Sequence, residues 1–219
     1  MLGEARIALR AIAANAAILV ARDEACIADV SFDGFGHGAE VSARAAIAGG
    51  VTRLVVGSGA EAAALASVGL TATVSQDHRG ANNLYGLGPD RDYEPAMSVS
   101  APVLGTKRVE PGDGVSYGYT FRATARSTLA LVGIGYADGL DRAASNVGTL
   151  LLGGVSRRIV GRVAMNVLMV DLGDSSVEPG EHAIVFDVRR RPSDWAMSIG
   201  RQPAEVAIEF GTKLSRVWS

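Results

Sequence analysis

Three side chains that could carry nucleophilic or acid–base chemistry lie in one glycine-rich segment, residues 27–38 (IADVSFDGFGHG). They are Ser31, Asp33 and His37. A catalytic triad needs a base that is oriented by a third group, and closeness along the chain does not establish that geometry. Asp and Ser commonly hydrogen-bond the backbone of loops, so we interpret the three as turn residues. The alternating glycines indicate that something approaches this backbone closely.

A second candidate segment, residues 55–62 (VVGSGAEA), has the spacing G-x-G-x-x-A between a predicted strand and a predicted helix. Asp77 follows Gly57 by twenty positions. Dinucleotide-binding units share this layout, because the glycines admit a pyrophosphate to the helix N-terminus and the acid binds a ribose hydroxyl. Glycine-rich turns from strand to helix are also common without any nucleotide. The pattern alone leaves both interpretations open.

Tyr136 is the third candidate, because it stands where a buried strand ends in a glycine turn, in residues 132–142 (VGIGYADGLDR). A turn of this kind can project the phenol into a cleft; the alternative is a tyrosine that packs at the rim of a barrel. Residues 159–172 (IVGRVAMNVLMVDL) follow, where Met165 and Asn166 interrupt an apolar run.

The remaining polar candidates indicate no further chemistry. His78 and His182 stand alone, so we expect surface or edge histidines and no metal site. Residues 189–191 (RRR) predict a solvated turn, since three arginines without an aromatic platform do not indicate nucleic-acid binding. Cys26 lies in an apolar run and is interpreted as a buried structural thiol, because reactive thiols need an electropositive, exposed site.

Composition narrows the function classes. The chain has 219 residues, 48% hydrophobic residues and a net charge of −2, which favours neither nucleic acid nor a membrane surface as a partner. The sequence contains no run of about 18 apolar residues, so we expect no transmembrane helix. A single cysteine fits a reducing compartment, so we expect a cytoplasmic protein. Lys107 and Lys213 are the only lysines.

The elements that position these residues change in character near residue 95. In residues 1–95, short apolar strands alternate with alanine-rich helices, which is typical of parallel βα units. The strand of residues 4–9 (EARIAL) opens this series, and residues 78–96 follow it as an irregular linker. In residues 96–219 the pattern is mostly antiparallel β, with a hairpin that turns at Gly153 and Gly154.

Together these stretches resemble alanine racemases, pyridoxal-phosphate enzymes in which a (β/α)8 barrel precedes a β domain. Four stretches of the second half follow the family in order: VSYGYTFRA, VGIGYADGLDRAASN, IVGRVAMNVLMVDL and EFGTKLSRVW. In the first half, ARIALRAIAAN resembles the family's opening A-x-I-D-L-x-A-I-x-x-N, and DVSFDGFGHGA resembles V-V-K-A-D-A-Y-G-H-G-A. The resemblance predicts a truncated barrel remnant in residues 1–95 and a racemase-like β domain in residues 96–219. It also explains the G-x-G-x-x-A spacing without a dinucleotide.

The resemblance also implies that the cofactor site is degenerate. The family lysine that carries pyridoxal phosphate corresponds to Ser31, and a hydroxyl cannot form an imine. A phosphate-binding tyrosine corresponds to Phe35, and the tyrosine of the closing P-Y-E segment corresponds to Ala204. Lys107 and Lys213 stand at other positions of the family pattern. We therefore expect no bound cofactor, and an active-site match that is only partial.

Two family site residues remain according to this resemblance. Tyr136 matches the second catalytic base, which we expect to be idle in the isolated chain, and Met165 matches a methionine on the substrate side. The aspartate after that methionine is Asn166. About five of the eight strand–helix units of the barrel are missing, together with the arginines that they carry in the family.

The sequence thus predicts a degenerate alanine-racemase-like protein without racemase activity on its own. It would serve as a dimerisation or interaction module, as a homodimer or as a heterodimer with a full-length racemase. Two alternatives stay open: a pyridoxal-phosphate-dependent alanine racemase with an unorthodox or partner-completed site, and a decayed gene product without a selected role. Whether the chain is an enzyme is not decided by sequence alone.

Overall fold

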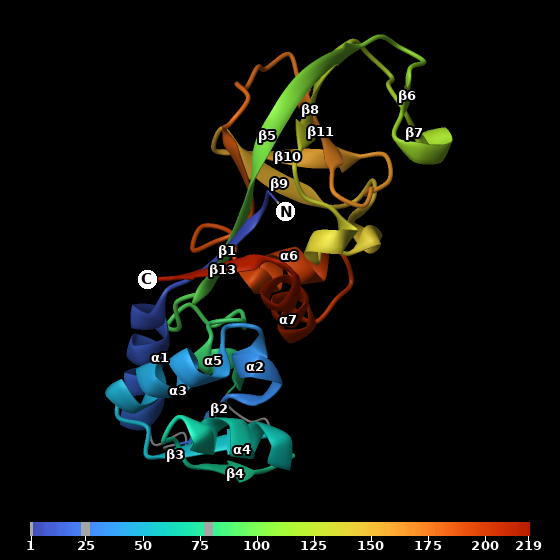
Figure 1. The fold of residues 1–219 in the computed structure, drawn as a ribbon. Coiled ribbons are helices and arrows are strands. Elements are labelled where there is room, and N and C mark those ends of the chain that lie inside the picture. Colours follow the sequence, from blue (N-terminus) through green and yellow to red (C-terminus); the bar gives the residue numbers. More distant parts are fainter. Residues whose placement is uncertain (1, 23–26, 77–80) are drawn as a thin grey trace.

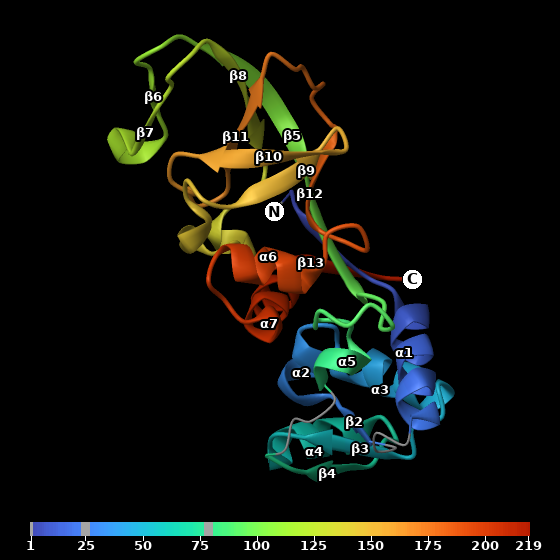
Figure 2. The same ribbon diagram turned by 180° about the vertical axis from the view of Figure 1, so that it is seen from behind.

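The structure, a computed structural model, describes residues 2–22, 27–76 and 81–219. Cys26, Asp77 and His78 lie outside the described residues, so the predictions made for them have no structural counterpart. Figures 1 and 2 show an elongated chain with two lobes: an α/β lobe of residues 9–84 and a β lobe that holds residues 97–219.

The α/β lobe contains a parallel sheet of three strands in the order β2-β3-β4. The strands are β2 (Ile27–Asp29), β3 (Arg53–Val56) and β4 (Ala72–Val74). The helices are α1 (Leu9–Ala21), α2 (Ser31–Phe35), α3 (Ala39–Ala48), α4 (Gly59–Ser67) and α5 (Ala81–Leu84). Strand–helix alternation in this part of the chain is confirmed.

Small residues let the helices of this lobe approach one another closely. A Cβ placed on Gly49 would lie 2.3 Å from the Ala13 carbonyl oxygen, so the end of α3 packs directly on the backbone of α1. The N-terminus of α4 is capped by Ser58, whose hydroxyl accepts from the Glu61 amide at 3.3 Å. A local signal therefore accounts for where α4 begins.

Both edges of this sheet are open in the part of the chain that the structure describes. β2 and β4 each pair only with β3 there. β3 buries Leu54 and Val56, as expected for the centre of a parallel sheet, whereas the side chain of Val74 on β4 is 49% exposed. A closed (β/α) barrel has no such edges.

The β lobe is built around a sheet that closes on itself. Six strands take part: β5 (Met97–Val109), β8 (Ser127–Val132), β9 (Thr149–Leu152), β10 (Val155–Val160), β11 (Leu168–Gly173) and β12 (His182–Phe186). They follow the order β12-β9-β10-β11-β8-β5, and β12 also pairs with β5. The predicted hairpin is confirmed, with Val155 paired to Leu152. A short ribbon of β6 (Gly114–Val115) and β7 (Phe121–Arg122) extends from the far end.

The strand β1 (Glu4–Ile7) exists as predicted, but it does not belong to the parallel sheet. It pairs antiparallel with β5 and parallel with the last strand, β13 (Ser215–Trp218). The expectation that it opens the βα series was therefore wrong, because its neighbours come from positions far along the chain. The domain boundary near residue 95 stays a prediction.

Two helices occur where the sequence pattern was interpreted as β structure. They are α6 (Pro192–Ser198) and α7 (Pro203–Lys213), each with proline in its first turn and an acidic residue, Asp194 or Glu205, that bonds back to the N-cap amide. α6 buries Trp195 and α7 buries Phe210 against the β lobe. These start signals are visible in the sequence and were missed.

The expectation of a solvated turn at residues 189–191 was wrong for two of the three arginines. Arg191 is only 5% exposed, and its guanidinium donates to four carbonyl oxygens of residues 86–93, at 2.7–3.1 Å. Arg190 lies over the Trp195 ring and donates to the Thr149 carbonyl. Arg189 is exposed, as predicted. The irregular segment before β5 is thus anchored to the β lobe, and it contains the short helix α5.

Candidate functional site

The position that the sequence resemblance assigns to the family lysine lies at the end of β2 and carries a buried serine. Ser31 is fully buried, and its Oγ donates to Asp29 Oδ1 at 2.5 Å. The Ser31 amide donates to the same oxygen at 2.9 Å. Tyr85 donates to the Asp29 carbonyl, and burial raises the pKa of its phenol. Among the described residues, this strand end is held by hydrogen bonds from a hydroxyl, a phenol and a backbone amide.

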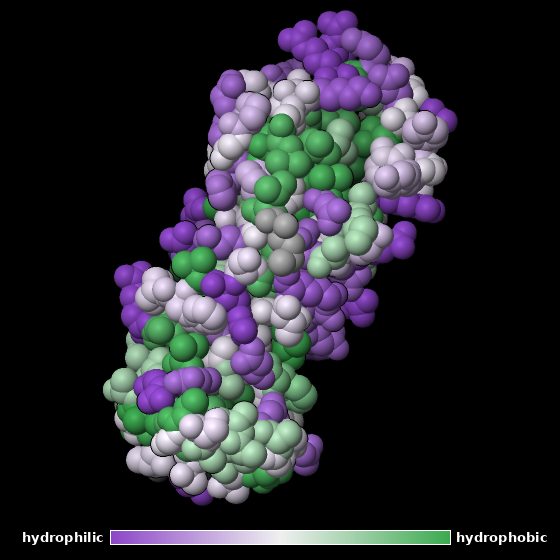
Figure 3. Space-filling view, viewed as in Figure 1, coloured by the Kyte–Doolittle hydropathy of each residue, from purple (hydrophilic) through white to green (hydrophobic). Residues whose placement is uncertain are grey.

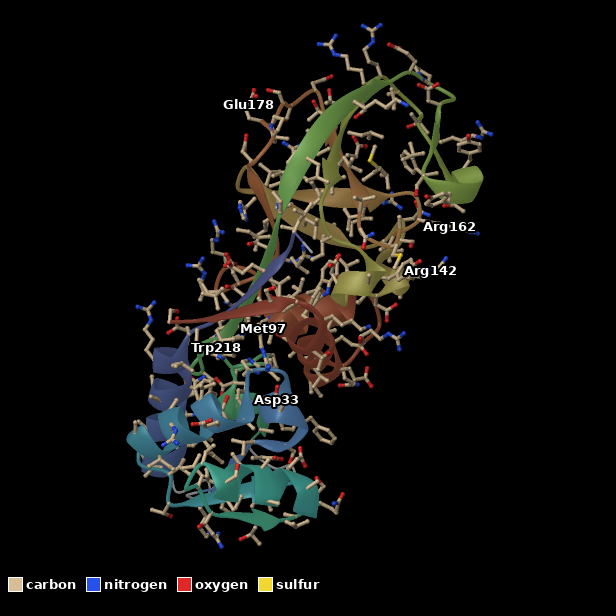
Figure 4. The ribbon with its side chains drawn as sticks, viewed as in Figure 1. Asp33, Met97, Arg142, Arg162, Glu178 and Trp218 are labelled. Atoms are coloured by element: carbon tan, nitrogen blue, oxygen red, sulfur yellow. The ribbon has the colours of Figure 1, made fainter. Side chains whose placement is uncertain are left out.

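The glycine-rich segment forms a left-handed turn. Positive φ angles run through Phe32, Asp33, Gly34, Phe35 and Gly36. Only glycine adopts this region without strain, so the three other residues must be held in place. Figure 4 shows Asp33 close to the C-terminal strand, which carries Trp218. The close approach that the glycines predicted is made by the protein itself, since a Cβ on Gly36 would lie 2.5 Å from the Ala207 oxygen in α7.

The C-terminal strand β13 holds this turn. Arg216 forms an ion pair with Asp33 at 2.5 Å, and the Trp218 indole donates to the His37 carbonyl at 2.9 Å. These two contacts account for Asp33 and the backbone of His37 as structural groups. Arg216 and Trp218 lie in the stretch EFGTKLSRVW, but nothing in the sequence linked them to residues 33–37.

His37 is unsuited to act as a general base. Its ring is fully buried and stacks on Tyr85 with the centroids 4.4 Å apart. Nδ1 lies 3.0 Å from the carbonyl oxygens of Gly34 and Phe35, so this nitrogen carries the proton. Burial lowers the pKa of the imidazole to about 4. Ser31, Asp33 and His37 bond to different partners, which agrees with their interpretation as turn residues.

The two other positions that the sequence resemblance interprets as degenerate, Phe35 and Ala204, offer no polar side chain. Phe35 is buried, and its ring packs against those of Phe32 and Tyr85 at 5.6 and 5.8 Å between centroids. Ala204 is half-buried at the start of α7 and packs against the core. Neither side chain can donate a hydrogen bond to a phosphate.

Tyr136 and Met165, in contrast, are brought together. Tyr136 begins the short 3-10 helix η2 (Tyr136–Asp138), which follows β8, and its amide donates to the Ala164 carbonyl at 3.0 Å. The Ala137 amide donates to the Met165 carbonyl at 2.9 Å. A Cβ on Gly135 would lie 2.3 Å from the Ala164 oxygen, so only glycine fits between the two segments. Both side chains are accessible, Tyr136 at 41% and Met165 at 56%.

Tyr136 is held in place by two residues, Asp138 and Arg142, that the sequence analysis did not single out. Asp138 is buried and accepts from the Gly135 amide at 2.9 Å, which fixes the turn before Tyr136. The guanidinium of Arg142, in the 3-10 helix η3 (Arg142–Ala144), lies 5.6 Å from the centre of the Tyr136 ring. Figure 4 shows Arg142 and Arg162 on the same side of the β lobe. Both Asp138 and Arg142 stand within the quoted stretch VGIGYADGLDR, so their proximity to Tyr136 was the available signal.

Tyr136 also borders a cleft of about 540 Å³ between η2, η3, α6 and α7. Leu140, Trp195, Val206 and Phe210 form its apolar floor. Its charged lining residues are Asp141, Arg142, Arg201, Glu205, Glu209 and Lys213. Of the two interpretations that the sequence left open for Tyr136, a phenol projected towards a cleft agrees with this arrangement.

Neither of the two lysines contacts Ser31 in the part of the chain that the structure describes. Lys107 is exposed on β5, whereas Lys213 pairs with Glu209 at 2.5 Å on α7. The G-x-G-x-x-A segment is a capped helix start, because Glu61 accepts from the Ser58 hydroxyl and from the Phe32 amide. His182 is exposed on β12, as predicted, and lies 3.2 Å from the Ser100 hydroxyl.

Within residues 2–22, 27–76 and 81–219, no three or more His, Cys, Asp or Glu side chains form a group that could hold a metal ion. Over the same residues, no helix has both the length and the apolar character needed to cross a bilayer.

The fold and the site define a protein with a racemase-type β domain, in which a tyrosine and a methionine are presented from adjacent turns. The family model "Alanine racemase, C-terminal domain" matches residues 96–218, more than half of the chain. The chain belongs to the alanine racemase family.

Relatives agree with this assignment and show how much of them the chain spans. An alanine racemase of Salinispora arenicola is 43% identical over 137 residues, which cover 59% of this chain and 37% of that protein. One of Mycolicibacterium smegmatis is 44% identical over 147 residues, covering 62% and 38%. The chain thus spans less than two fifths of the length of these relatives.

Solved structures support the same fold. Alanine racemase from Streptomyces lavendulae aligns with a TM-score of 0.89 and 22% identity, over 100% of this chain and 97% of that chain. Alanine racemase from Bartonella henselae, solved with covalently bound pyridoxal phosphate, aligns with a TM-score of 0.88 and 18% identity, over 100% of each chain. At such identity the likeness concerns the fold.

Proposed function

We propose that this chain is an alanine-racemase-family protein that does not racemise alanine by itself and that acts as an interaction module. The observation that carries this proposal is the end of β2, where Ser31 is buried and bonded to Asp29. Racemisation needs an electron sink and a base on each face of the α-carbon. In our reading Tyr136 is one such base, and the other base and the anchor of the sink are absent together.

The residues at this strand end do not fit pyridoxal phosphate. The Ser31 hydroxyl cannot form an imine, and it is already engaged by a carboxylate that would repel a phosphate. Phe35 and Ala204 supply no donor at the two positions where the family resemblance expects tyrosines. The parallel sheet of three strands is, in this proposal, a barrel remnant without the units that complete a cofactor site.

Association is supported by what the two lobes leave exposed. Tyr136 and Met165 project from adjacent turns of the β lobe. On the α/β lobe, Phe32, Ile47 and Val74 are 44–50% exposed, and β2 and β4 have open edges among the described residues. Figure 3 shows hydrophobic areas on both lobes. Exposed apolar patches and unpaired edges favour a partner. We propose a homodimer or a heterodimer with a full-length racemase, in the cytoplasm, as the single cysteine indicates.

Light scattering across a dilution series tests the association, with the protein alone and mixed with the alanine racemase of Mycolicibacterium smegmatis. We expect a mass that falls with dilution, or a mixed complex. Met165→Glu should weaken association at least tenfold, because it places a charge on the interface. Met197→Glu, at a methionine on α6 that is 75% exposed, is the control. A monomer at micromolar concentration that ignores the racemase would overturn the proposal.

One observation favours the alternative of a racemase with an unorthodox site: Lys213 lines the same cleft as Tyr136. Incubation with pyridoxal phosphate, reduction with borohydride and peptide mass mapping separate the two functions. We expect no stoichiometric adduct. An adduct at Lys213 that disappears in Lys213→Arg, but not in Lys107→Arg, would favour the alternative.

A further inference from the structure

Among the described residues, the cleft beside Tyr136 has two charged side chains that form no ion pair. Of its six charged residues, Asp141 and Arg201 form an ion pair at 2.6 Å, and Glu209 and Lys213 form another at 2.5 Å. Within the part of the chain that the structure describes, Arg142 has no carboxylate partner and contacts the Tyr136 ring. Glu205 has no cationic partner there and accepts only a long bond, 3.4 Å, from the Gln202 amide.

These two charges stand on different elements and line the same cleft. Arg142 belongs to η3 and Glu205 to the first turn of α7. The same cleft is lined by Val206 and Phe210, which are buried, and by Leu140. A ligand that matches this lining has an apolar body, an anionic group for Arg142 and a cationic group for Glu205. The volume of the cleft, about 540 Å³, lies within the range of small-molecule pockets, about 300–1,000 Å³.

We propose that this cleft binds a short apolar peptide with free termini, its carboxylate at Arg142 and its ammonium at Glu205. A dipeptide carries its two charges at separate ends of an apolar body. Arginine suits the carboxylate because its planar fork can donate two parallel hydrogen bonds. The cleft is complete within one chain, so this inference does not rest on the proposed association.

The probe is the dipeptide Leu-Phe, with N-acetylated and C-amidated forms as comparisons. Binding is followed by the NMR shifts of the Leu140, Ile199 and Val206 methyl groups, which line the cleft. We expect saturable shifts with Leu-Phe and at least tenfold weaker binding of either capped form, since each cap removes one charge–charge contact. Free leucine, which carries both charges on one carbon, should bind more weakly than Leu-Phe.

Variants assign each end of the peptide. Arg142→Gln should weaken Leu-Phe about tenfold, or 1.4 kcal/mol, and leave the amidated form unaffected. Glu205→Gln, which keeps a side chain able to cap α7, should weaken Leu-Phe and leave the acetylated form unaffected. Arg126→Gln and Glu178→Gln, exposed and outside the cleft, are the controls.

The ligand series makes the result independent of how the variants fold. Absence of saturable shifts with Leu-Phe would overturn the proposal. Equal binding of the free and capped peptides would do so as well, because the two charges would then play no part. Light scattering of the same samples reports the oligomer separately, so loss of peptide binding and loss of the proposed association are distinguishable.

Discussion

Ser31 Oγ donates to Asp29 Oδ1 at 2.5 Å, and both residues are buried at the end of β2. In the family resemblance, position 31 is that of the cofactor lysine and position 29 is that of a valine. The two departures therefore complement each other: a carboxylate that would be costly to bury alone is bonded by the hydroxyl and the amide of residue 31. The end of β2 is consistent with a structural unit rather than an anchor for a ligand.

Ser31→Lys should not produce alanine racemisation. The new ammonium would be buried beside Asp29 and form an ion pair with it, which leaves no free amine. We expect the variant to be less stable than wild type, because burying an ammonium costs several kcal/mol that one ion pair offsets only in part. Chiral chromatography of alanine after incubation with pyridoxal phosphate checks activity. Measurable D-alanine from this single variant would contradict the proposed loss of function.

Gly211→Ala should lower the free energy of unfolding by about 2–3 kcal/mol, in the range measured for overpacked cores. The new methyl carbon would lie 2.0 Å from the Gly36 carbonyl oxygen, where α7 packs against the glycine-rich turn. Gly59→Ala is the control, because α4 offers open space at that position. Urea unfolding of both variants checks the contrast. Equal stabilities would mean that α7 and the turn are not in close contact.

Replacing Arg191 with glutamine should lower the free energy of unfolding by about 2–4 kcal/mol, because several buried carbonyl groups lose their donor. The guanidinium serves four carbonyls of residues 86–93. The neighbouring Arg189→Gln removes an exposed arginine and should change stability by less than about 1 kcal/mol. Thermal and urea unfolding measure both. If Arg189→Gln were the more damaging change, the buried position of Arg191 would be contradicted.

Acid should destabilise the fold through His37, whose pKa is lowered to about 4 by burial. Between about pH 6.5, the ordinary value for histidine, and pH 4, the unfolded chain binds a proton that the folded chain does not. The free energy of unfolding therefore falls as the pH falls through this window. Each unit of difference between the folded and unfolded pKa values is worth about 1.4 kcal/mol, so the total loss is up to about 3 kcal/mol. Above pH 7 the imidazole contributes no slope.

His37→Gln isolates this effect, since glutamine does not titrate. Urea unfolding at pH 7.5, 6.0 and 5.0 should show a steeper loss for wild type than for the variant. Carboxylates titrate in both proteins, so the difference between the two reports on residue 37. Parallel pH profiles would contradict the lowered pKa, because they would mean that His37 binds protons equally in the folded and unfolded states.

Much of the local structure was determined by the sequence alone. The alternation of apolar strands and alanine-rich helices predicted β2, β3 and β4 with the helices between them. The hairpin at Gly153 and Gly154 followed from glycine turn chemistry. The family followed from stretches such as VGIGYADGLDR, because residues that surround a site recur in order. Periodicity, turn residues and caps act over a few positions, so one sequence is enough to recognise them.

Only the tertiary structure decided what depends on distant partners. β1 was expected to open the parallel βα series, but it lies beside β5 and β13. Strand pairing is set by the whole sheet, so the local pattern could not predict these neighbours. Arg191 is buried since carbonyl groups about a hundred positions earlier accept its hydrogen bonds. The cleft that joins Tyr136 to α7 arises in the same way, from packing between segments remote in the chain. Side-chain burial and charge pairing depend on these contacts, and no local pattern encodes them.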